Sequence, residues 1–348
     1  MNTMKTSPLT PAVSILTPTY NHASYLEPCL QSALRQTFPD WEQLILDDGS
    51  TDATPRIAAT FQDPRIRYLR QEHRGVFRLA ETYNVGLQQA RAPLIAILEG
   101  DDLWHPDMLK TQMKRFQDPQ VVLSFAQVAA VVGGEIRQIP QPMASWPAEA
   151  KANDPLGSAL PPILCFEGMP QPMTWIIRRS ALEAIGGFRQ VPGIPTTDYP
   201  TLLALCLQGR FAYTPQVLAY WRQYAGQTSS RFSGAVFTGC ADYALQFYEQ
   251  EIAEKNRFAI SLSPRRLRGK IHRQRVIGHL KQGRYELLAR RGPEARDSFG
   301  KAWREGSPLM RIASGAGWCL SWLGQDLEWC ARLIGKQWYR RPPEDLDA

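Results

Sequence analysis

The stretches LILDDGS (residues 44–50) and IAILEGDD (residues 95–102) each place carboxylates directly after an apolar, strand-like run. In open α/β sheets, ligands bind just beyond the carboxyl ends of parallel strands, so both acidic clusters are candidates for one site. The second cluster has the spacing Glu-x-Asp-Asp, and such carboxylates can hold a divalent cation together with phosphate oxygens. Each cluster alone also fits a solvated turn between a strand and a helix. The two together favour a binding site.

The composition is that of an ordinary globular protein. The chain has 348 residues, 44% of them hydrophobic and 21% charged, which suits one large domain or two of average size. No apolar run reaches the roughly 18 residues of a membrane-spanning helix, and residues 1–11 lack the apolar core of a secretory signal. The six cysteines show no paired metal-binding spacing: Cys29, Cys165, Cys206, Cys240, Cys319 and Cys330. We therefore expect a cytoplasmic protein with reduced thiols and no zinc site.

The net charge of +7 lies in the last third of the chain. Between residues 255 and 304 there are 15 Lys and Arg against 3 Asp and Glu. Such a bias is typical of a solvated helical face, but it also suits a surface that meets anionic lipid. A helical pattern over residues 313–333 carries Trp318, Trp322 and Trp329 near one side, which indicates either a membrane-interface anchor or a packed helix hairpin. Peripheral contact with the inner face of the cytoplasmic membrane is therefore one expectation.

Apolar strand-like runs alternate with helical patterns in the first two thirds of the chain, which predicts βαβ units and a parallel sheet. We expect strands over residues 12–20, 41–46, 66–69, 94–98, 121–132, 174–177, 211–213 and 217–220, and helices over 25–36, 79–90, 180–185 and 201–208. Residues 140–172 are rich in Pro and Gly, which predicts long loops with little regular structure. The sequence therefore predicts an α/β domain over residues 1–234 and an α-helical region over 235–348.

Four motifs in a fixed order carry a family resemblance: VSILTPTYN (13–21), QTFPDWE (36–42), LDDGSTD (46–52) and EGDD (99–102). In combination they resemble the inverting glycosyltransferases of family 2, over roughly residues 12–230. The resemblance implies the GT-A fold, which is a Rossmann-like mixed sheet flanked by helices that binds nucleotide-diphospho-sugars. It also implies Mg²⁺ or Mn²⁺ as the cofactor.

The resemblance places the nucleotide of the donor at the ends of the first two predicted strands. Pro18, Thr19 and Tyr20 would pack against the nucleotide and contact it through the backbone. Asp48, or alternatively Asp47, would accept the imide N–H of the base in a charge-assisted hydrogen bond. A structural capping role is the other interpretation of Asp47.

The resemblance places the metal at an Asp-x-Asp motif, and here Glu99, Gly100 and Asp101 occupy those positions. Glu99 departs from the family pattern but keeps a carboxylate, one methylene further from the backbone. Asp101 would ligate the cation with Asp102 beside it, and Glu99 and Gly100 would lie against the donor. A cation bound there would neutralise the charge that grows on the leaving diphosphate.

Arginines are candidates for contacts with the donor phosphates. Many family members have an arginine directly before Asn84, where this chain has Tyr83. Arg78 or Arg74 would supply the missing positive charge, unless both are ordinary exposed side chains. Arg222 lies in a segment that resembles the Tyr-Arg-x-His segment of the family, and it would also contact phosphate.

An inverting transfer needs a general base that takes the proton of the attacking hydroxyl. The family places a Glu-Asp pair before a helix, and the segment IPTTDYP at residues 194–200 lies at the matching place. Thr197 replaces the Glu, so Asp198 is the candidate base. As a plain sequence feature, Asp198 could instead cap the helix that follows.

The resemblance implies a metal-dependent inverting glycosyltransferase that uses a nucleotide-diphospho-sugar, with a UDP-sugar favoured. The acceptor hydroxyl would belong to a polysaccharide, a glycolipid or another cell-envelope glycan, and no nucleic acid partner is expected. The departures at Glu99 and Thr197 also fit a nucleotide-sugar-binding relative with impaired catalysis. An ordinary dinucleotide-binding Rossmann enzyme is disfavoured, because PTYN rather than Gly-x-Gly-x-x-Gly follows the first predicted strand.

Overall fold

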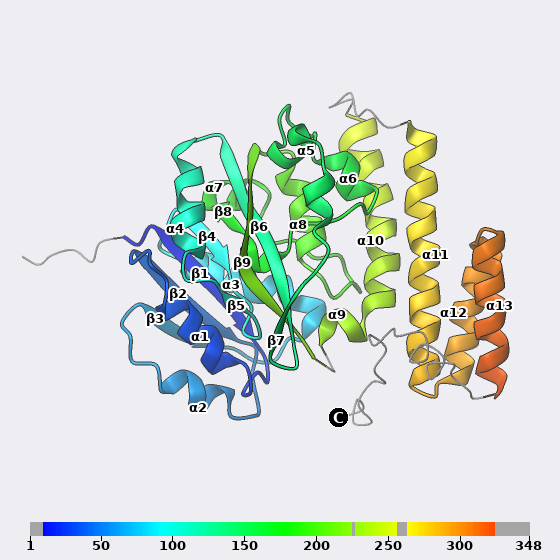
Figure 1. Ribbon diagram of the computed structural model, residues 1–348, viewed down its shortest axis with the longest axis horizontal. Coiled ribbons are helices and arrows are strands. Elements are labelled where there is room, and N and C mark those ends of the chain that lie inside the picture. Colours follow the sequence, from blue (N-terminus) through cyan, green and yellow to red (C-terminus); the bar gives the residue numbers. More distant parts are fainter. Residues whose placement is uncertain (1–9, 225–226, 256–262, 324–348) are drawn as a thin grey trace, which may run out of the picture. The chain divides into compact units, whose positions relative to one another are not determined.

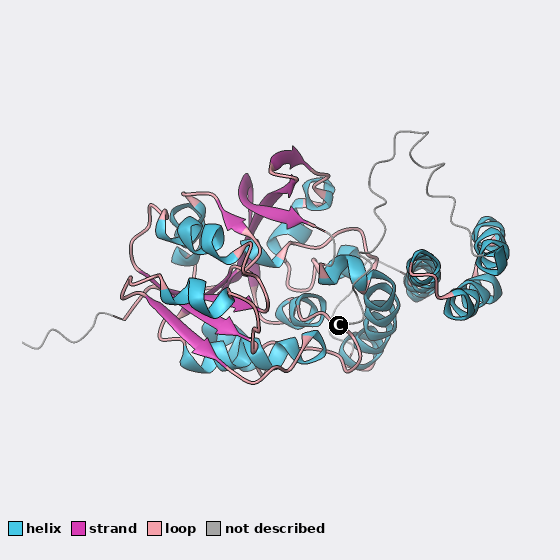
Figure 2. Cartoon of the chain, turned by 90° about the horizontal axis from the view of Figure 1, so that it is seen from below, coloured by secondary structure: helices cyan, strands magenta, loops and turns pink. Residues whose placement is uncertain are grey.

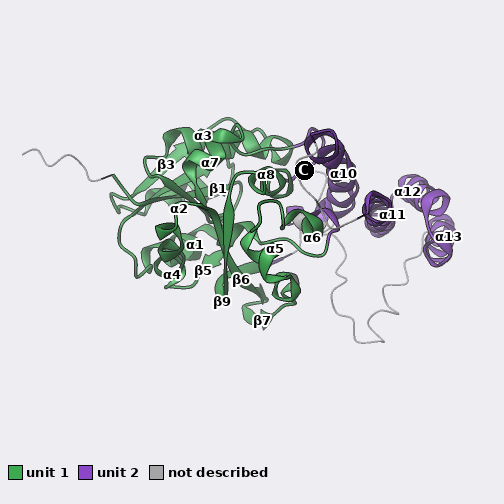
Figure 3. Ribbon diagram, turned by 90° about the horizontal axis from the view of Figure 1, so that it is seen from above, with its two compact units in different colours: residues 1–163, 167–190, 197–222 green, residues 164–166, 191–196, 223–348 purple. Residues whose placement is uncertain are grey.

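The computed structural model describes residues 10–224, 227–255 and 263–323. The chain divides into two compact units (Figures 1 and 3). Unit 1 comprises residues 1–163, 167–190 and 197–222, and unit 2 comprises residues 164–166, 191–196 and 223–348. The strands belong to unit 1, whereas the elements described after residue 227 are helices (Figure 2). The domain boundary after residue 234 stays a prediction.

Four parallel strands form the first half of the sheet in unit 1, in the order β3-β2-β1-β4. These strands are β1 (Val13–Thr19), β2 (Trp41–Asp47), β3 (Ile66–Arg70) and β4 (Leu94–Ile97). The helices that connect them are α1 (Leu26–Leu34), α2 (Thr54–Ala59) and α3 (Leu79–Gln89), the last preceded by the 3₁₀ turn η1 (Val76–Arg78). The predicted alternation of strands and helices is confirmed for this half.

The second half of the sheet makes it mixed, as the fold class predicts. The order continues from β4 through β8, β6 and β9 to β5, with β7 paired to β6, and the β4·β8, β8·β6, β6·β7 and β5·β9 pairs are antiparallel. The strands are β5 (Leu103–Trp104), β6 (Val121–Val132), β7 (Glu135–Gln138), β8 (Ile176–Arg178) and β9 (Arg210–Gln223). The helices α4 (Met108–Met113), α7 (Arg179–Ala184) and α8 (Asp198–Leu205) and the 3₁₀ turn η2 (Lys114–Gln117) lie between them along the chain.

The core of unit 1 lies on both faces of this sheet. All seven residues of β1 and all seven of β2 are buried, and polar side chains among them bond across the pair: Ser14 Oγ donates to Glu42 Oε1 at 2.7 Å and Gln43 Nε2 donates to Thr17 Oγ1 at 2.9 Å. On α3, Gly86 lets the helix approach the sheet closely, because a Cβ there would lie 2.6 Å from Leu46 and 3.0 Å from Leu16. Each buried Leu or Ile contributes about 1.5–3 kcal/mol of hydrophobic free energy, so the central strands hold their carboxyl ends firmly in place.

Two predictions about secondary structure were wrong. Residues 140–172 contain more regular structure than predicted, since they include short helical segments: η3 (Pro142–Ser145), α5 (Ala148–Ala152), α6 (Leu160–Leu164) and the start of η4 (Pro172–Thr174). Prolines occupy the first turns of such segments, where their fixed φ suits a helix start. The separate strands predicted over 211–213 and 217–220 are one long strand, β9. Pro215 is exposed within it, a position where a missing N–H is tolerated.

Unit 2 contains a long helical array: α9 (Thr228–Arg231), α10 (Ser233–Phe247), the π-helical turn η5 (Tyr248–Ala253), α11 (Pro264–Leu288), α12 (Gly292–Glu305) and α13 (Pro308–Leu323). Glycines permit close packing: a Cβ on Gly278 of α11 would lie 2.6 Å from Thr238 of α10. The predicted helix over 313–333 corresponds to α13 up to Leu323, and its remainder, with Trp329, lies outside the described residues. Within the described ranges, no helix combines the length and apolar character needed to cross a membrane.

Candidate active site

The carboxyl ends of the four parallel strands lie at one edge of the sheet in unit 1. The register pairs Thr19 at the end of β1 with Asp47 at the end of β2, and Asp47 with Arg70 at the end of β3. Beyond the end of β4, the amide of Gly100 donates to the carbonyl of Pro18 at 3.0 Å. The chain places β2 and β3 on one side of β1 and β4 on the other, so the strand order changes direction between β1 and β4. Open α/β sheets bind ligands at such a switch point. The predicted Pro18, Asp47 and Gly100 segments therefore meet.

The end of β1 presents one buried polar atom and one exposed ring. The carbonyl of Thr19 accepts the amide of Asp48 at 2.9 Å, which ties the two strand ends together. The Thr19 hydroxyl is buried and has no hydrogen-bond partner among the described residues. The Tyr20 ring is 39% exposed and stacks on the His73 imidazole, with ring centroids 4.1 Å apart. The pair forms a flat aromatic surface at the edge of the site.

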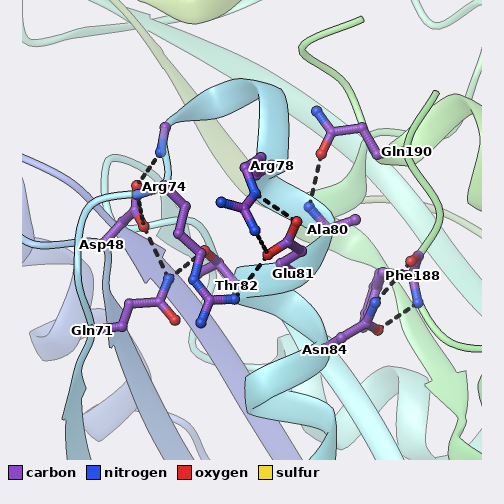
Figure 4. A network of polar contacts seen from close by, with 11 residues as sticks. Asp48, Gln71, Arg74, Arg78, Ala80, Glu81, Thr82, Asn84, Phe188 and Gln190 are labelled. Carbon is purple, nitrogen blue, oxygen red and sulfur yellow. Dashed lines mark hydrogen bonds and ion pairs between the residues drawn. The ribbon is translucent and has the colours of Figure 1, made fainter. Parts of the chain in front are cut away.

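The Asp48 carboxylate organises the loop that follows β3 (Figure 4). Its Oδ1 accepts from Gln71 Nε2 at 2.9 Å and from the Arg74 amide at 3.0 Å. Its Oδ2 accepts from the Gly75 amide at 2.8 Å and lies 3.0 Å from His73 Nδ1. The carboxylate is therefore saturated by its own loop, and a hydrogen bond to a base would replace one of these contacts. The role of Asp48 in base binding stays a prediction.

Asp47 closes the turn after β2. It is fully buried, its Oδ1 accepts the Ser50 amide at 2.8 Å, and its Oδ2 accepts the Tyr68 hydroxyl. Burial and the neighbouring Asp47 carboxylate together raise the pKa of Tyr68 well above its usual value. Tyr68 therefore stays protonated and donates. These contacts are those of a structural residue, and a direct contact of Asp47 with a base stays a prediction.

The two candidate arginines of the loop converge on one glutamate (Figure 4). Arg78 donates to Glu81 from Nε and from Nη2, both at 2.7 Å, and Arg74 Nη1 lies 3.1 Å from Glu81. The Arg78 side chain is 61% exposed, so it can exchange this partner for a phosphate at little cost. In the described structure both guanidinium groups form ion pairs with Glu81, and their predicted phosphate contacts stay predictions.

In the acidic cluster after β4, Asp101 and Asp102 are buried and Glu99 is half-buried. Glu99 Oε1 accepts the Tyr83 hydroxyl at 3.3 Å, while Glu99 Oε2 has no hydrogen-bond partner in the described part of the chain. Burial, reinforced by the charges of Asp101 and Asp198, raises the pKa of Glu99 to about 8. Burial, together with Asp101 and Glu99, also raises the pKa of Asp102 well above its usual value. The cluster is thus a concentration of carboxylates whose full ionisation is opposed by burial and by their mutual repulsion, and the positive charge of Arg222 offsets this in part at Asp102.

Asp198 belongs to the same electrostatic site although it lies about a hundred residues further along the chain. It is the first residue of α8, it is half-buried, and its Oδ1 accepts the Tyr199 amide at 2.7 Å. Its charge raises the pKa values of both Glu99 and Tyr83, so the three groups lie within electrostatic reach of one another. Thr197 occupies the N-cap position without a capping hydrogen bond from its side chain. The candidate base therefore lies within electrostatic reach of the acidic cluster.

Arg222 reaches the site from β9. Its backbone amide donates to Asp102 Oδ1 at 2.9 Å, and its Nη1 donates to the Tyr25 carbonyl at 2.9 Å. The guanidinium also lies over the Tyr25 ring, 5.6 Å from its centroid. Arg222 thus anchors Asp102 through its backbone, and its predicted contact with phosphate stays a prediction.

The residues after β4 fit a divalent cation that is shared with a phosphate ligand. Among the described residues, no three His, Cys, Asp or Glu side chains are arranged to hold a metal ion by themselves. Mg²⁺ usually takes only one or two carboxylates and completes its shell with water and substrate phosphates. Asp101, Asp102 and Glu99 supply oxygen donors only, and the orphaned Glu99 Oε2 is a buried acceptor that a cation would satisfy. The donor chemistry therefore suits Mg²⁺ or Mn²⁺ bound together with a phosphate.

Four further site residues were not predicted. Tyr83, noted in the sequence only as a departure, donates to Glu99 and stacks on Phe188 with ring centroids 4.8 Å apart. Gln71 and His73 both hold Asp48, and their place directly after a parallel strand was the signal that could have identified them. Asn84 of α3 binds the Phe188 backbone through two hydrogen bonds, at 3.0 and 2.8 Å (Figure 4). These contacts fix the chain as it leads toward Asp198.

Comparison with known proteins agrees with this geometry. The model of the family "Glycosyl transferase family 2" matches residues 14–186. The putative glycosyltransferase EpsH of Bacillus subtilis is 34% identical over 179 residues, which cover 50% of this chain and 49% of EpsH. The putative teichuronic acid biosynthesis glycosyltransferase TuaG of the same species is 35% identical over 117 residues, covering 33% of this chain and 46% of TuaG. The chain thus spans about half or less of the curated relatives it matches.

Solved structures share the fold at low sequence identity. Staphylococcus aureus TarS 1–349 in complex with UDP-GlcNAc has a TM-score of 0.57 and 17% identity, covering 94% of this chain and 93% of TarS 1–349. The mannosyltransferase PcManGT of Pyrobaculum calidifontis, in complex with GDP-Man and Mn²⁺, has a TM-score of 0.50 and 20% identity, covering 94% of this chain and 87% of PcManGT. These likenesses establish the fold.

Proposed function

We propose, from the premise that this chain belongs to glycosyltransferase family 2, that it moves a sugar from a nucleotide-diphospho-sugar to an acceptor hydroxyl with inversion at the anomeric carbon. The observation that carries this proposal is that the charge of Asp198 acts on Glu99, whose segment follows β4 and lies beside the end of β1 at the carboxyl edge of the sheet. This edge offers a place for the nucleotide, a place for the diphosphate and a base, all within unit 1.

The donor would span the site from the ends of β1 and β2 to the acidic cluster. The exposed ring of Tyr20 offers an apolar face for the base, and the saturated Asp48 fixes the loop beside it. Asp101 and Asp102, together with Glu99, would hold Mg²⁺ or Mn²⁺ against the diphosphate. A cation bound there would supply Lewis-acid stabilisation of the departing nucleoside diphosphate. We favour a UDP-sugar as the donor.

Asp198 would act as the general base. It takes the proton of the acceptor hydroxyl while the acceptor oxygen forms a bond to the anomeric carbon and the bond from that carbon to the diphosphate oxygen breaks. Because both events occur in one displacement, the sugar inverts and no covalent enzyme intermediate forms. Tyr83 and the Asn84–Phe188 contacts hold the surrounding backbone in position, so the rate gain would come from positioning, charge stabilisation and base catalysis.

The acceptor is proposed to be a cell-envelope glycan, a polysaccharide or a glycolipid, and the reaction is proposed to occur on the cytoplasmic side. The name of TuaG, a relative that matches one third of this chain, refers to teichuronic acid biosynthesis and supports the envelope class. A second candidate is a nucleotide-sugar-binding relative without catalysis. The observation that favours it is that Thr197 stands where the family places a carboxylate next to Asp198.

Donor turnover tests the proposal. Wild type, Asp198→Asn and Asp101→Ala are incubated with Mn²⁺ and a panel that includes UDP-GlcNAc and GDP-mannose, and release of nucleoside diphosphate is measured. Base catalysis contributes about 10²–10⁴-fold, so we expect Asp198→Asn to lose activity on that scale. Asp242→Asn, which changes an exposed carboxylate of α10, is the matched control and should keep full activity.

Two outcomes decide between the candidates. Turnover by wild type that clearly exceeds turnover by both variants supports the transferase. If wild type turns over no donor faster than either variant, the enzymatic proposal fails. Cation-dependent binding of a donor without turnover would then favour the binding relative.

A further inference from the structure

In α13, the last described helix of unit 2, small residues are buried and large apolar residues are exposed. Its inward positions are small, with Ser314 and Ser321 at 0% and 4% exposure and Gly317 buried between them. Its outward positions are large and apolar: Leu309, Ile312, Trp318, Trp322 and Leu323, which are 80%, 68%, 43%, 62% and 69% exposed. We call these five residues the outer face of α13. A soluble helix normally shows the opposite distribution.

The inward residues are small because α12 packs very close. A Cβ on Gly317 would collide with the ring of Phe299, and a Cβ on Gly315 would lie 2.7 Å from the Trp303 indole. Larger residues at the inward positions of α13 would separate α12 from α13. The large apolar side chains of α13 therefore occupy its outward positions. Trp303 of α12 is itself 50% exposed and extends the apolar area beside Gly315. Contiguous exposed apolar area of this kind marks a binding surface.

Charge identifies what this surface would meet. Within residues 263–311 there are 14 Lys and Arg against 4 Asp and Glu. Arg311 is the one charged residue of α13 in its described span, and Arg296 of α12 lies over the Trp322 ring, 4.0 Å from its centroid. Apolar side chains bordered by arginine, with tryptophans whose rings have both an apolar body and a polar N–H, suit the headgroup region of an anionic bilayer.

We infer that the outer face of α13 inserts into the headgroup region of a membrane rich in anionic phospholipid. A second copy of the chain is the less suitable occupant, because two strongly basic surfaces would repel each other when they meet. Anionic headgroups attract the same surface, at about 1 kcal/mol for each Lys or Arg close to the membrane. The membrane would hold the protein where lipid-linked acceptors lie. The inference rests on unit 2 alone and does not depend on the donor chemistry of unit 1.

Vesicle binding tests this inference with the full chain. Co-sedimentation is measured with vesicles of phosphatidylglycerol and phosphatidylcholine and with vesicles of phosphatidylcholine alone. The variant Leu309→Asp/Ile312→Asp places charges at two of the most exposed positions of the outer face, where the side chains are 80% and 68% exposed. The matched control is Ile136→Asp, because Ile136 of β7 is 62% exposed in unit 1. Circular dichroism melts confirm that each variant is folded.

The expected result is that wild type and the Ile136→Asp control bind the anionic vesicles, and that the double variant binds at least about tenfold more weakly. Binding should fall when salt rises from about 0.05 to about 0.5 M, because the Debye length shortens. Tryptophan emission should shift to the blue on binding. The inference would be overturned if wild type does not bind anionic vesicles, or if the double variant binds them as well as wild type does. So would a wild-type dimer, seen by sedimentation, that the double variant abolishes, because the face would then be covered by a second copy.

Discussion

Replacement of the half-buried Glu99 by glutamine should stabilise the protein at pH 8.5 in the absence of a cation. In the folded state the pKa of Glu99 is raised to about 8 from an ordinary value of 4.5, so the folded protein keeps a proton that the unfolded chain releases within this pH window. Stability therefore falls as the pH rises from about 4.5 to about 8, at up to about 1.4 kcal/mol per pH unit. Glutamine carries no proton to release, so the variant lacks this loss.

The size of the effect follows from burial and from the hydrogen bonds of the side chain. The loss accumulated by wild type at pH 7 is at most about 3 kcal/mol, and it is offset by about 1–3 kcal/mol for burying an amide N–H₂ where Glu99 Oε2 has no partner. We therefore expect Glu99→Gln to melt at or below wild type at pH 5, and several degrees above it at pH 8.5. One kcal/mol corresponds to about 2–4 °C in a domain of this size.

A cation should reverse the order of the two proteins. Carboxylates bind a metal in their deprotonated form, so Mn²⁺ should stabilise wild type more strongly as the pH rises, and should stabilise Glu99→Gln much less. The assay is thermal unfolding at pH 5, 7 and 8.5, with and without Mn²⁺, and Glu135→Gln of the exposed β7 strand is the control. Equal melting of wild type and Glu99→Gln at pH 8.5 would refute the proposed charge concentration. Equal stabilisation of both by Mn²⁺ would refute the cation site.

The remaining predictions concern glycines that position the site. Gly187→Ala should destabilise unit 1 by about 2–4 kcal/mol in chemical denaturation, because Gly187 has φ +92° and its new methyl would displace the Asn84 amide. Gly186→Ala, at φ +82° with no atom within 4 Å, isolates the backbone strain and should cost only about 1 kcal/mol, so equal losses would refute the clash. Gly100→Ala would bring a methyl within 2.8 Å of Thr19 Oγ1, and should weaken donor binding in calorimetry by about tenfold or more. Unchanged donor affinity would show that Gly100 does not lie against the donor.

The central sheet and its carboxyl edge could be predicted because they are determined by local sequence. An apolar run that ends in Asp47 or Glu99 indicates both where a buried strand ends and that carboxylates follow it. The contacts between those ends could not be predicted in the same way. The saturation of Asp48 by its loop and the bond from Tyr83 to Glu99 depend on how α3 and β3 pack, and no periodicity in the sequence encodes that packing.

The irregular regions show a similar limit. Prolines between residues 140 and 172 predict loops, although proline also begins short helices, and only tertiary packing decides between the two outcomes. Likewise two strands are predicted over residues 211–213 and 217–220, whereas β9 continues through Pro215, whose exposed position tolerates a missing N–H. The outward apolar face of α13 could be suspected from its tryptophans. Its inverted distribution depends on the packing of Gly317 against Phe299 of α12 and on the burial of Ser314, which no periodicity in the sequence encodes.

The stereochemistry of donor cleavage tests the central claim most directly. Proton NMR of early time points, with an α-linked nucleotide-diphospho-sugar and water as the acceptor, identifies the anomer that is released first. A single displacement assisted by Asp198 predicts the β-anomer first, at a rate that Asp198→Asn lowers by about 10²-fold or more and that Asp242→Asn leaves unchanged. Initial release of the α-anomer, or β-anomer formed equally fast by Asp198→Asn, would contradict the proposed mechanism.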